Sequence, residues 1–382
     1  MNQFGFVGET TEYKLSDLFN LQMGKTPSRN NAEFWSDGEY KWISIADLTK
    51  TGKYISETKE LLSQKAIDES GIAVIPTNTV VMSFKLSIGK TAITSEDMYS
   101  NEAIMSFHDR HVTELLPEYI YYLLLAQRWD EGANKAVMGM TQNKATLSNR
   151  KVRIHSIIAQ KSIVERLDKL QKLIDDRKTQ LDELETLIKA RFVEIFGNPE
   201  DSGNEWEQKP LSDLLNVIGG YAFKSDQFSE IGGIPVLRIG NINAGVFRPV
   251  NMVYWEDDEK LERYAIYAGD LVMSLTGTVG KDDYGNVCIM GNEYDKYYLN
   301  QRNAKLEIKS GLDKYYLSEL LKFECVKKKL TGISRGVRQA NISNKDILNL
   351  VVNVPPIELQ NQFAAFVTQV DKLKFVETIA RF

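Results

Sequence analysis

Six polar segments of the chain carry residues that could bind a duplex nucleic acid. Lys and Arg neutralise phosphates, Ser and Thr hydroxyls fix register on the backbone, and Arg, Asn and Gln present paired donors and acceptors to base edges. The segments are residues 24–31, 85–90, 141–144, 219–225, 276–281 and 334–341. The DNA-binding candidates come from these segments and, for two of them, from residues 238–241. They are Lys25, Thr26, Ser28, Arg29, Lys85, Lys90, Gln142, Asn143, Lys144, Lys224, Arg238, Asn241, Thr276, Thr278, Lys281, Arg335, Arg338, Gln339 and Asn341.

Turn formation is the alternative explanation for each of these segments. Gly, Ser, Asn and Thr are the commonest residues of turns, and a single segment is explained by that use alone. Duplication favours binding, because the polar clusters return beside the same strand signatures while the sequence between them differs. Two surfaces that read different sequences would need such divergence.

Catalytic motifs fail when their residues are checked one by one. Gly89-Lys90-Thr91 ends like a phosphate-binding loop, but Phe84 stands where such a loop needs its first glycine. His108 and His111 have no second cluster of ligands, so a surface or core histidine pair is the better interpretation. The sequence also lacks the dinucleotide fingerprint. We therefore expect no metal, no cofactor and no catalysis by this chain alone.

An internal repeat indicates which elements must position the polar segments. Leu15-Ser16-Asp17-Leu18 returns as Leu211-Ser212-Asp213-Leu214, and the echo continues in order. The further pairs are 42–48 with 236–242, 81–84 with 272–275, 145–149 with 340–344, and 167–170 with 370–373. Two copies in one chain predict two similar domains, which suits a target that is itself roughly two-fold.

Each copy is predicted to be α+β. Runs rich in β-branched and aromatic residues predict strands at 42–45, 79–84, 236–239 and 270–275. Aromatic and leucine positions recur without a breaker at 119–127 and 315–322, which indicates helices. We expect two tandem, mainly β domains with their helices segregated to one side.

A long helix is predicted between the two copies. Its apolar residues follow the alternating four-three spacing of a coiled-coil seam, and Gly197 with Pro199 supplies the stop. These residues are Ile163, Leu167, Leu170, Ile174, Leu181, Leu184, Ile188 and Ile195.

A second helix after Pro356 is expected to cover this seam in an antiparallel coiled coil. Phe363, Phe366, Val370 and Leu373 continue at similar spacing. The alternative is that each helix packs on its own domain. The predicted boundaries are residues 1–156 for the first domain, 157–202 for the central helix and linker, 203–355 for the second domain, and 356–382 for the last helix.

Composition agrees with two soluble domains. The chain has 382 residues, 43% of them hydrophobic, which is enough for two cores. Its two cysteines cannot build a disulfide framework, and no apolar run approaches the roughly 20 residues of a membrane span, so we expect a cytoplasmic protein. The net charge of −5 argues against nucleic acid at first, but binding needs only a local basic surface.

Taken together, the chain resembles the specificity subunit of type I restriction-modification systems. The shared features are tandem domains that open with a Leu-Ser-Asp-Leu-like segment and are followed by a long helix. Particular matches are Gly24-Lys25-Thr26-Pro27-Ser28, Gly89-Lys90, Arg335–Ser343 and Val354–Gln360. Individually these motifs are weak, and their order, duplication and spacing make the match specific.

The resemblance implies a non-catalytic reader of double-stranded DNA. Each recognition domain would bind one half of a bipartite site, and the paired helices would set the spacer between the halves. Modification subunits that use S-adenosylmethionine would dock on the helices, and restriction subunits would add cleavage driven by ATP with Mg²⁺.

Two departures and one competing function are retained as expectations. The first copy has Ile154-His155-Ser156-Ile157 where the second has Val354-Pro355-Pro356-Ile357, so the starts of the two helices are expected to differ. The last helix is expected to be shorter than the central one. The competing function is a non-catalytic scaffold whose two modules bind glycans or other polymers through Trp35, Trp42, Tyr221, Tyr254 and Trp255.

Overall fold

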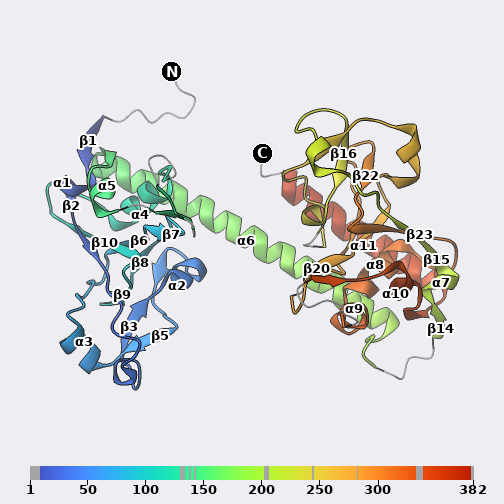
Figure 1. The fold of residues 1–382 in the computed structure, drawn as a ribbon, viewed down its shortest axis with the longest axis horizontal. Coiled ribbons are helices and arrows are strands. Elements are labelled where there is room, and N and C mark those ends of the chain that lie inside the picture. The colour runs from blue at the N-terminus through green and yellow to red at the C-terminus, as the bar shows by residue number, and fades with distance from the viewer. Residues whose placement is uncertain are drawn as a thin grey trace. The chain divides into compact units, whose positions relative to one another are not determined.

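The computed structural model divides into two compact units, residues 1–175 and 176–382, and each is described by itself. The structure describes residues 9–129, 134–136, 139–141, 143–201, 206–242, 245–281, 283–332 and 339–379. Gln142, Arg335 and Arg338 of the predicted site lie outside these residues. The central helix α6 (Ile157–Phe196) crosses the boundary and contributes to both units (Figure 1).

The first unit contains four small sheets. Their orders are β2-β10-β6-β8-β4, β5-β3-β9, β11-β12-β7 and β1-β13. The strand bounds are β1 (Thr10–Lys14), β2 (Phe19–Met23), β3 (Tyr40–Ile43), β4 (Tyr54–Ile55), β5 (Glu60–Leu62), β6 (Val80–Ser83), β7 (Lys85–Leu86), β8 (Thr91–Thr94), β9 (Tyr99–Ser100), β10 (Ile104–Asp109), β11 (Asn134–Ala136), β12 (Gly139–Thr141) and β13 (Lys151–His155).

The second unit repeats this plan. Its sheets are β15-β23-β19-β21, β17-β16-β22-β18, β20-β24 and β14-β25. The strand bounds are β14 (Glu207–Pro210), β15 (Leu215–Gly219), β16 (Ile234–Leu237), β17 (Val253–Trp255), β18 (Ala265–Ile266), β19 (Leu271–Ser274), β20 (Thr276–Thr278), β21 (Val287–Ile289), β22 (Tyr297–Leu299), β23 (Asn303–Ile308), β24 (Gln339–Asn341) and β25 (Val351–Val354). A parallel pair corresponds between the units, β3 with β9 and β16 with β22, and in the first unit β4 also pairs parallel with β8.

The helices also correspond between the units. The first unit has α1 (Leu15–Leu18), η1 (Ala32–Phe34), α2 (Ile45–Lys50), α3 (Gln64–Ser70), α4 (Pro117–Leu125) and α5 (Lys144–Ser148). The second has α7 (Leu211–Leu214), η2 (Ser225–Gln227), η3 (Ile239–Asn241), η4 (Glu259–Tyr264), α8 (Lys314–Lys322), α9 (Glu324–Thr331), α10 (Asn344–Leu348) and α11 (Ile357–Ile379), where η marks 3-10 helices. The predicted α+β class with helices beside a β body is therefore confirmed.

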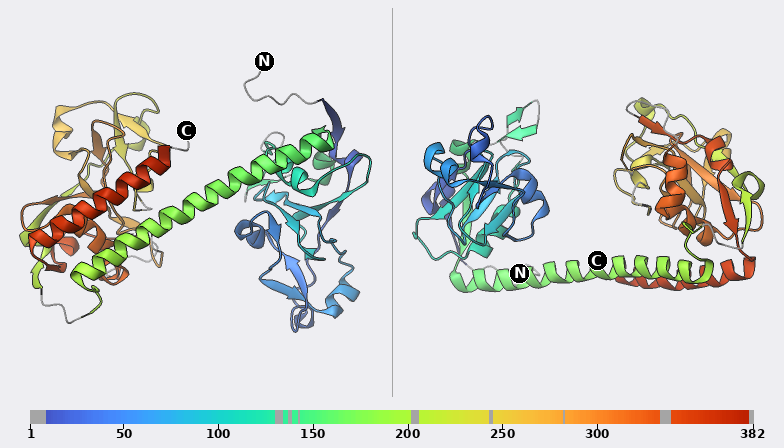
Figure 2. Two further views of the ribbon diagram at one scale, coloured as in Figure 1. Left: turned by 180° about the vertical axis from the view of Figure 1, so that it is seen from behind. Right: turned by 90° about the horizontal axis from the view of Figure 1, so that it is seen from below.

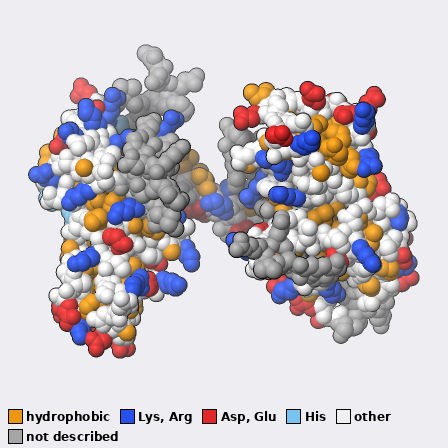
Figure 3. Space-filling view, viewed as in Figure 1, with side chains coloured by type: hydrophobic (Ala, Val, Ile, Leu, Met, Phe, Trp, Pro, Cys, Tyr) orange, Lys and Arg blue, Asp and Glu red, His pale blue; other side chains and the backbone are white. Residues whose placement is uncertain are grey.

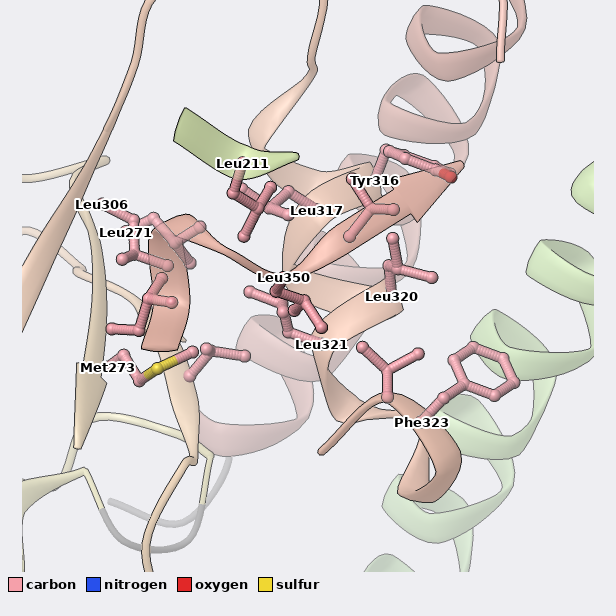
Figure 4. Close-up of a cluster of buried hydrophobic side chains, with 14 of the residues drawn as sticks. Leu211, Leu271, Met273, Leu306, Tyr316, Leu317, Leu320, Leu321, Phe323 and Leu350 are labelled. Carbon is pink, nitrogen blue, oxygen red and sulfur yellow. The ribbon is translucent and has the colours of Figure 1, made fainter. Parts of the chain in front are cut away.

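Each unit buries its own apolar core beside α6. The main core of the second unit joins strand residues such as Leu271 and Met273 to α8 residues such as Tyr316 and Leu320 (Figure 4). The C-terminal half of α6 adds Ile188, Phe192 and Phe196 to this core. In the first unit, Ile163 and Val164 of α6 pack against the core formed by the sheet and α4.

In the second unit, α11 lies antiparallel to the C-terminal half of α6 (Figure 2). The Phe192 and Phe363 ring centroids are 5.5 Å apart, and Lys374 Nζ lies 2.7 Å from Glu185 Oε1. Phe192 follows Glu185 along α6, whereas its partner Phe363 precedes Lys374 along α11. The two helices therefore run in opposite directions. The predicted antiparallel pairing is therefore present in this half of α6.

The predicted seam differs in detail from the contacts that form. On α6, Ile188 is buried and Leu184 packs against the second core, Leu167 and Leu181 are half-buried, and Leu170 and Ile174 are 55% and 48% exposed. On α11, Phe363, Val367 and Val370 are buried, Phe366 is partly buried, and Leu373 is 55% exposed. The predicted seam along all of α6 is thus corrected: only the C-terminal half of α6 pairs with α11. On α11, the fully buried residue between Phe363 and Val370 is Val367 and not Phe366. Val367 lies four residues after Phe363 and therefore on the same face of the helix.

One buried glutamine fixes the start of each long helix. Gln160 and Gln360 are both 0% exposed. The Gln160 amide accepts from Leu116 N at 3.0 Å and donates to the Glu114 and His155 carbonyls at 2.9 Å each. The Gln360 amide accepts from Asp313 N at 2.8 Å and donates to the Gly311 and Pro355 carbonyls at 3.1 and 2.8 Å.

The two helix starts are therefore alike, although their sequences predict a difference. Histidine and proline stand at matching places, but the glutamine uses only their backbone carbonyls.

Within the described residues, no helix combines the length and the apolar character needed to cross a membrane.

Candidate nucleic-acid interface

In each unit, the loop after β2 or β15 lies against the loop after β9 or β22. Lys25 N donates to Ser100 O at 2.8 Å, and Tyr221 N donates to Leu299 O at 2.8 Å. Glycine is needed at this approach, because a Cβ on Gly24 would lie 2.3 Å from Ser100 O and one on Gly220 would lie 2.2 Å from Asn300 O. The glycines of the repeated polar segments therefore bring two loops together.

The loop after β9 or β22 has the same backbone hydrogen bonds in both units. Asn101 N donates to Ile43 O at 3.1 Å, and Asn300 N donates to Leu237 O at 3.2 Å. The Asn101 and Asn300 side-chain oxygens then accept from the backbone two residues later, at 3.0 and 3.3 Å. We name residues 101–103 and 300–302 the recognition loops of the first and second unit.

The recognition loops also join the segments that follow the central strands. Phe84 N donates to Ala103 O at 2.9 Å, and Leu275 N donates to Arg302 O at 2.8 Å. Beyond these residues, Lys85 pairs with Thr141 across β7 and β12, and Thr276 pairs with Asn341 across β20 and β24. The structure thus connects polar segments that are far apart in the sequence into one surface per unit.

Cationic side chains of the first surface already have partners in the protein. Arg29 forms an ion pair with Glu60, with a second contact of 3.0 Å between Nη2 and Oε2, and its guanidinium carbon lies 3.7 Å from the Trp35 ring centroid. The hydrogen bond between them raises the pKa of Arg29 and lowers the pKa of Glu60. This pairing holds the guanidinium in one orientation.

Glu102 gives the first recognition loop an ionised carboxylate. Burial acts to raise the pKa of Glu102, but the hydrogen bond from Thr26 and the nearby charges of Lys85 and Arg29 outweigh it, so the pKa lies below its ordinary value. An ionised carboxylate only accepts hydrogen bonds. This loop therefore selects for donor groups.

Other candidates of the first unit serve partly structural roles. The Lys25 and Lys90 amines donate to Ser70 O and Thr49 Oγ1. Asn143 caps α5 by accepting from Thr146 N at 2.8 Å, whereas Ser28 and Lys144 are exposed. Asn143 is exposed as well, so its predicted DNA contact stays a prediction beside its capping role.

In the second unit, Asn241 is predicted from the sequence to contact DNA, but the structure places its side chain inside the fold. It is 3% exposed, and its side-chain amide donates to the Val250 carbonyl at 3.0 Å, so it anchors the following loop. Thr276 is also buried, and its hydroxyl donates to Asn341 Oδ1 at 2.7 Å. Among the candidates of the second unit, Lys224, Thr278, Lys281 and Asn341 are exposed, and only the backbone of Gln339 is described.

The sequence reasoning missed the recognition loops themselves. Glu102, Gln301 and Arg302 were not candidates, although a short signal precedes them in both copies. Tyr99 and Tyr298 are each followed two residues later by asparagine, Asn101 and Asn300. The signal consists of only these two positions, so it becomes visible only after the strands of the two copies have been aligned.

Figure 3 shows Lys and Arg side chains spread over the visible face of each unit, and Asp and Glu side chains mostly near the edges of each unit. Among the described residues, no group of three or more His, Cys, Asp or Glu side chains is placed to hold a metal ion. His108 and His111 do not converge on a shared ligand: His108 Nε2 lies 2.9 Å from Ser106 Oγ, and His111 Nδ1 lies 3.3 Å from Asp109 Oδ2.

Aromatic residues suggested for glycan stacking pack mainly within the fold. Trp42 is 2% exposed and forms an edge contact with Trp35 at 5.1 Å between centroids. Trp255 packs on Phe223 at 5.0 Å, and Tyr221, at 37% exposed, contacts both Phe223 and Tyr264. These rings pack in the hydrophobic cores or at the edges of those cores. Their packing therefore does not favour the competing scaffold function.

Two copies of one β-rich module, each with a polar loop cluster and a long helix, define a tandem recognition protein. The family described as "Type I restriction modification DNA specificity domain" matches residues 8–186 and again residues 203–380. The chain therefore belongs to this family, and the resemblance inferred from the repeat is confirmed. Specificity subunits confer sequence specificity on partner subunits and are not catalytic themselves.

Named relatives agree with the family. The MjaVIII specificity subunit of Methanocaldococcus jannaschii is 25% identical over 94% of this chain and 85% of that relative. The MjaIX specificity subunit of the same organism is 27% identical over 61% of this chain and 58% of that relative. The crystal structure of an S subunit from M. genitalium shares the fold at 13% identity, with a TM-score of 0.55 over 99% of this chain and 93% of that one.

Proposed function

We propose that each unit binds one half of a bipartite duplex DNA site, and that the chain gives sequence specificity to methyltransferase and endonuclease partners. The observation that carries this proposal is the repeated recognition loop. Its backbone hydrogen bonds match in the two units, while its side chains differ: Glu102 and Ala103 in one, Gln301 and Arg302 in the other. A shared frame with different donors and acceptors suits two readers of different base sequences.

We propose further that modification subunits dock on α6 and α11 and that restriction subunits complete the complex. The exposed apolar residues Leu170, Leu173 and Ile174 on α6 support a protein partner for this helix. S-adenosylmethionine, ATP and Mg²⁺ would bind to those partner subunits. A reader of cellular DNA in such a complex would act in the cytoplasm.

Methylome sequencing tests the proposed function directly. Cells that express the chain with its modification partners should carry methyladenine in one split motif, and deletion of the chain should remove that motif. Retention of every methylated motif after deletion would contradict the proposal.

Spacer length is predicted to affect binding. Inserting one base pair between the half-sites rotates them by roughly 34–36° and separates them by about 3.4 Å, since a helical turn contains 10–10.5 base pairs. Only one half-site can then be engaged well, and we expect affinity to fall at least about tenfold, the cost of one or more lost base contacts. Titration of the assembled complex with the two duplexes measures this, and a duplex with one half-site scrambled is the control. Equal affinity for both spacers would contradict the fixed-spacing idea.

A further inference from the structure

The described residues that line a cleft beside the second recognition loop include no Asp or Glu. Its volume is about 560 Å³, and it is lined by Phe223, Ser225, Phe228, Arg238, Ile239, Gly240, Asn241, Val250, Asn251, Asn300, Gln301 and Arg302. Two arginines and four amide residues therefore line one cavity, and none of its described lining residues is Asp or Glu. Such a lining favours a ligand that presents acceptor groups.

Arg238 and Arg302 contribute differently to this cleft. Arg238 donates one guanidinium N–H to Asn251 O, while its buried Nε has no hydrogen-bond partner. Arg302 is exposed, and in the described part of the chain its side chain has neither a hydrogen bond nor an ion pair. Arg238 is thus fixed at the wall, whereas the donors of Arg302 remain available to a ligand.

The matching position in the first unit has no such cation. Aligned backbone hydrogen bonds place Ala103 at the position of Arg302 and Glu102 at the position of Gln301. The nearby Arg29 is paired with Glu60. The two units therefore offer opposite chemistry at the same point of the same loop.

We propose that Arg302 reads a guanine in the half-site bound by the second unit. A guanidinium donates two parallel hydrogen bonds to guanine O6 and N7, which is the commonest specific arginine contact in the major groove. A base is favoured over a phosphate because the neighbouring Gln301 is exposed, and its amide presents one donor beside one acceptor, which matches a base edge. This assignment rests on the proposed function and names the base that one residue of that surface selects.

Selection from a duplex library tests the assignment. The full chain, assembled with its modification subunits, is presented with duplexes randomised in both half-sites. Wild type is expected to enrich a G·C pair in the half-site of the second unit. Arg302→Ala is expected to lose preference at that pair by about 10- to 100-fold and to leave the other half-site unchanged.

Two variants separate base reading from charge. Arg302→Lys keeps the charge but loses the planar fork, so preference at that pair should still fall. Arg248→Ala removes the same charge from another cavity of the second unit, and its enriched sequences should equal those of wild type. A uniform loss of affinity with Arg302→Ala that Arg302→Lys restores would make Arg302 a phosphate contact and overturn the assignment.

The failure of the assignment differs from the failure of the proposed function. If wild type enriches a split sequence and Arg302→Ala enriches the same one, only the role of Arg302 is overturned. If wild type enriches no sequence, DNA reading itself is overturned, and the guanine contact with it.

Discussion

Phe192→Ala is expected to lower the free energy of unfolding of the second unit by about 3–5 kcal/mol, the usual cost of truncating a buried phenylalanine. The Phe192 side chain is 1% exposed. Its ring lies within 5.5 Å, between centroids, of the rings of Phe196, Tyr316, Phe323 and Phe363. The loss is large because one ring joins α6, α8 and α11, and because small domains are stable by only about 5–15 kcal/mol.

Hydrogen exchange detected by mass spectrometry measures this effect unit by unit. Amides of α8 and α11 should lose protection in Phe192→Ala, while core amides of the first unit keep theirs. Leu187→Ala is the matched control, since Leu187 lies on the same half of α6 but is 49% exposed; it should change stability by no more than about 0.5 kcal/mol. Equal protection in both variants would show that the helix pair does not stabilise this core.

Local signals in the sequence predicted the elements well. The strands expected at 79–84 and 270–275 correspond to β6 and β19, and the helices expected at 119–127 and 315–322 correspond to α4 and α8. The long helix ends at Phe196, where Gly197 adopts a left-handed φ of 82°. These features depend on side-chain period and on backbone freedom, which a short segment encodes by itself.

The helix seam was predicted less well, because tertiary partners select the face that is buried. The buried glutamines set the register at 200 residues, from Gln160 to Gln360. In that register Leu170 matches Val370, so the sequence echo of 167–170 with 370–373 is displaced by three residues. Three residues are nearly one helical turn, so the displaced residues lie on the same face of the helix but beside different neighbours.

The polar surface was predicted at the level of segments. The repeat indicated which polar segments correspond in the two copies, whereas the pairing of Lys85 with Thr141 and of Thr276 with Asn341 is seen only in the structure. Individual roles could not be predicted, because Asn143 and Asn241 have the same side chain as a base reader and are used for capping and anchoring. Which amide faces solvent depends on contacts that lie far away in the sequence.

Gln360→Ala is expected to destabilise the second unit by about 2–4 kcal/mol. The change removes three hydrogen bonds and leaves a partly buried N–H of Asp313 without its acceptor. Sequence reasoning missed this residue because glutamine is ordinarily a surface residue of helices. Gln160→Ala should produce the same loss in the first unit, where the amide has equivalent partners.

Gln360→Met separates the hydrogen bonds from the packing, since methionine fills nearly the same volume and forms no comparable bonds. We expect it to restore little of the stability lost in Gln360→Ala. Gln171→Ala is the control, because Gln171 is exposed on α6 and its side chain donates to Asp175 of the same helix at 3.1 Å. Urea unfolding combined with hydrogen exchange gives the loss in each unit. A fully stable Gln360→Met would assign the role of Gln360 to its volume, and loss of protection in both units from Gln360→Ala would contradict the independent anchoring of each helix by its own unit.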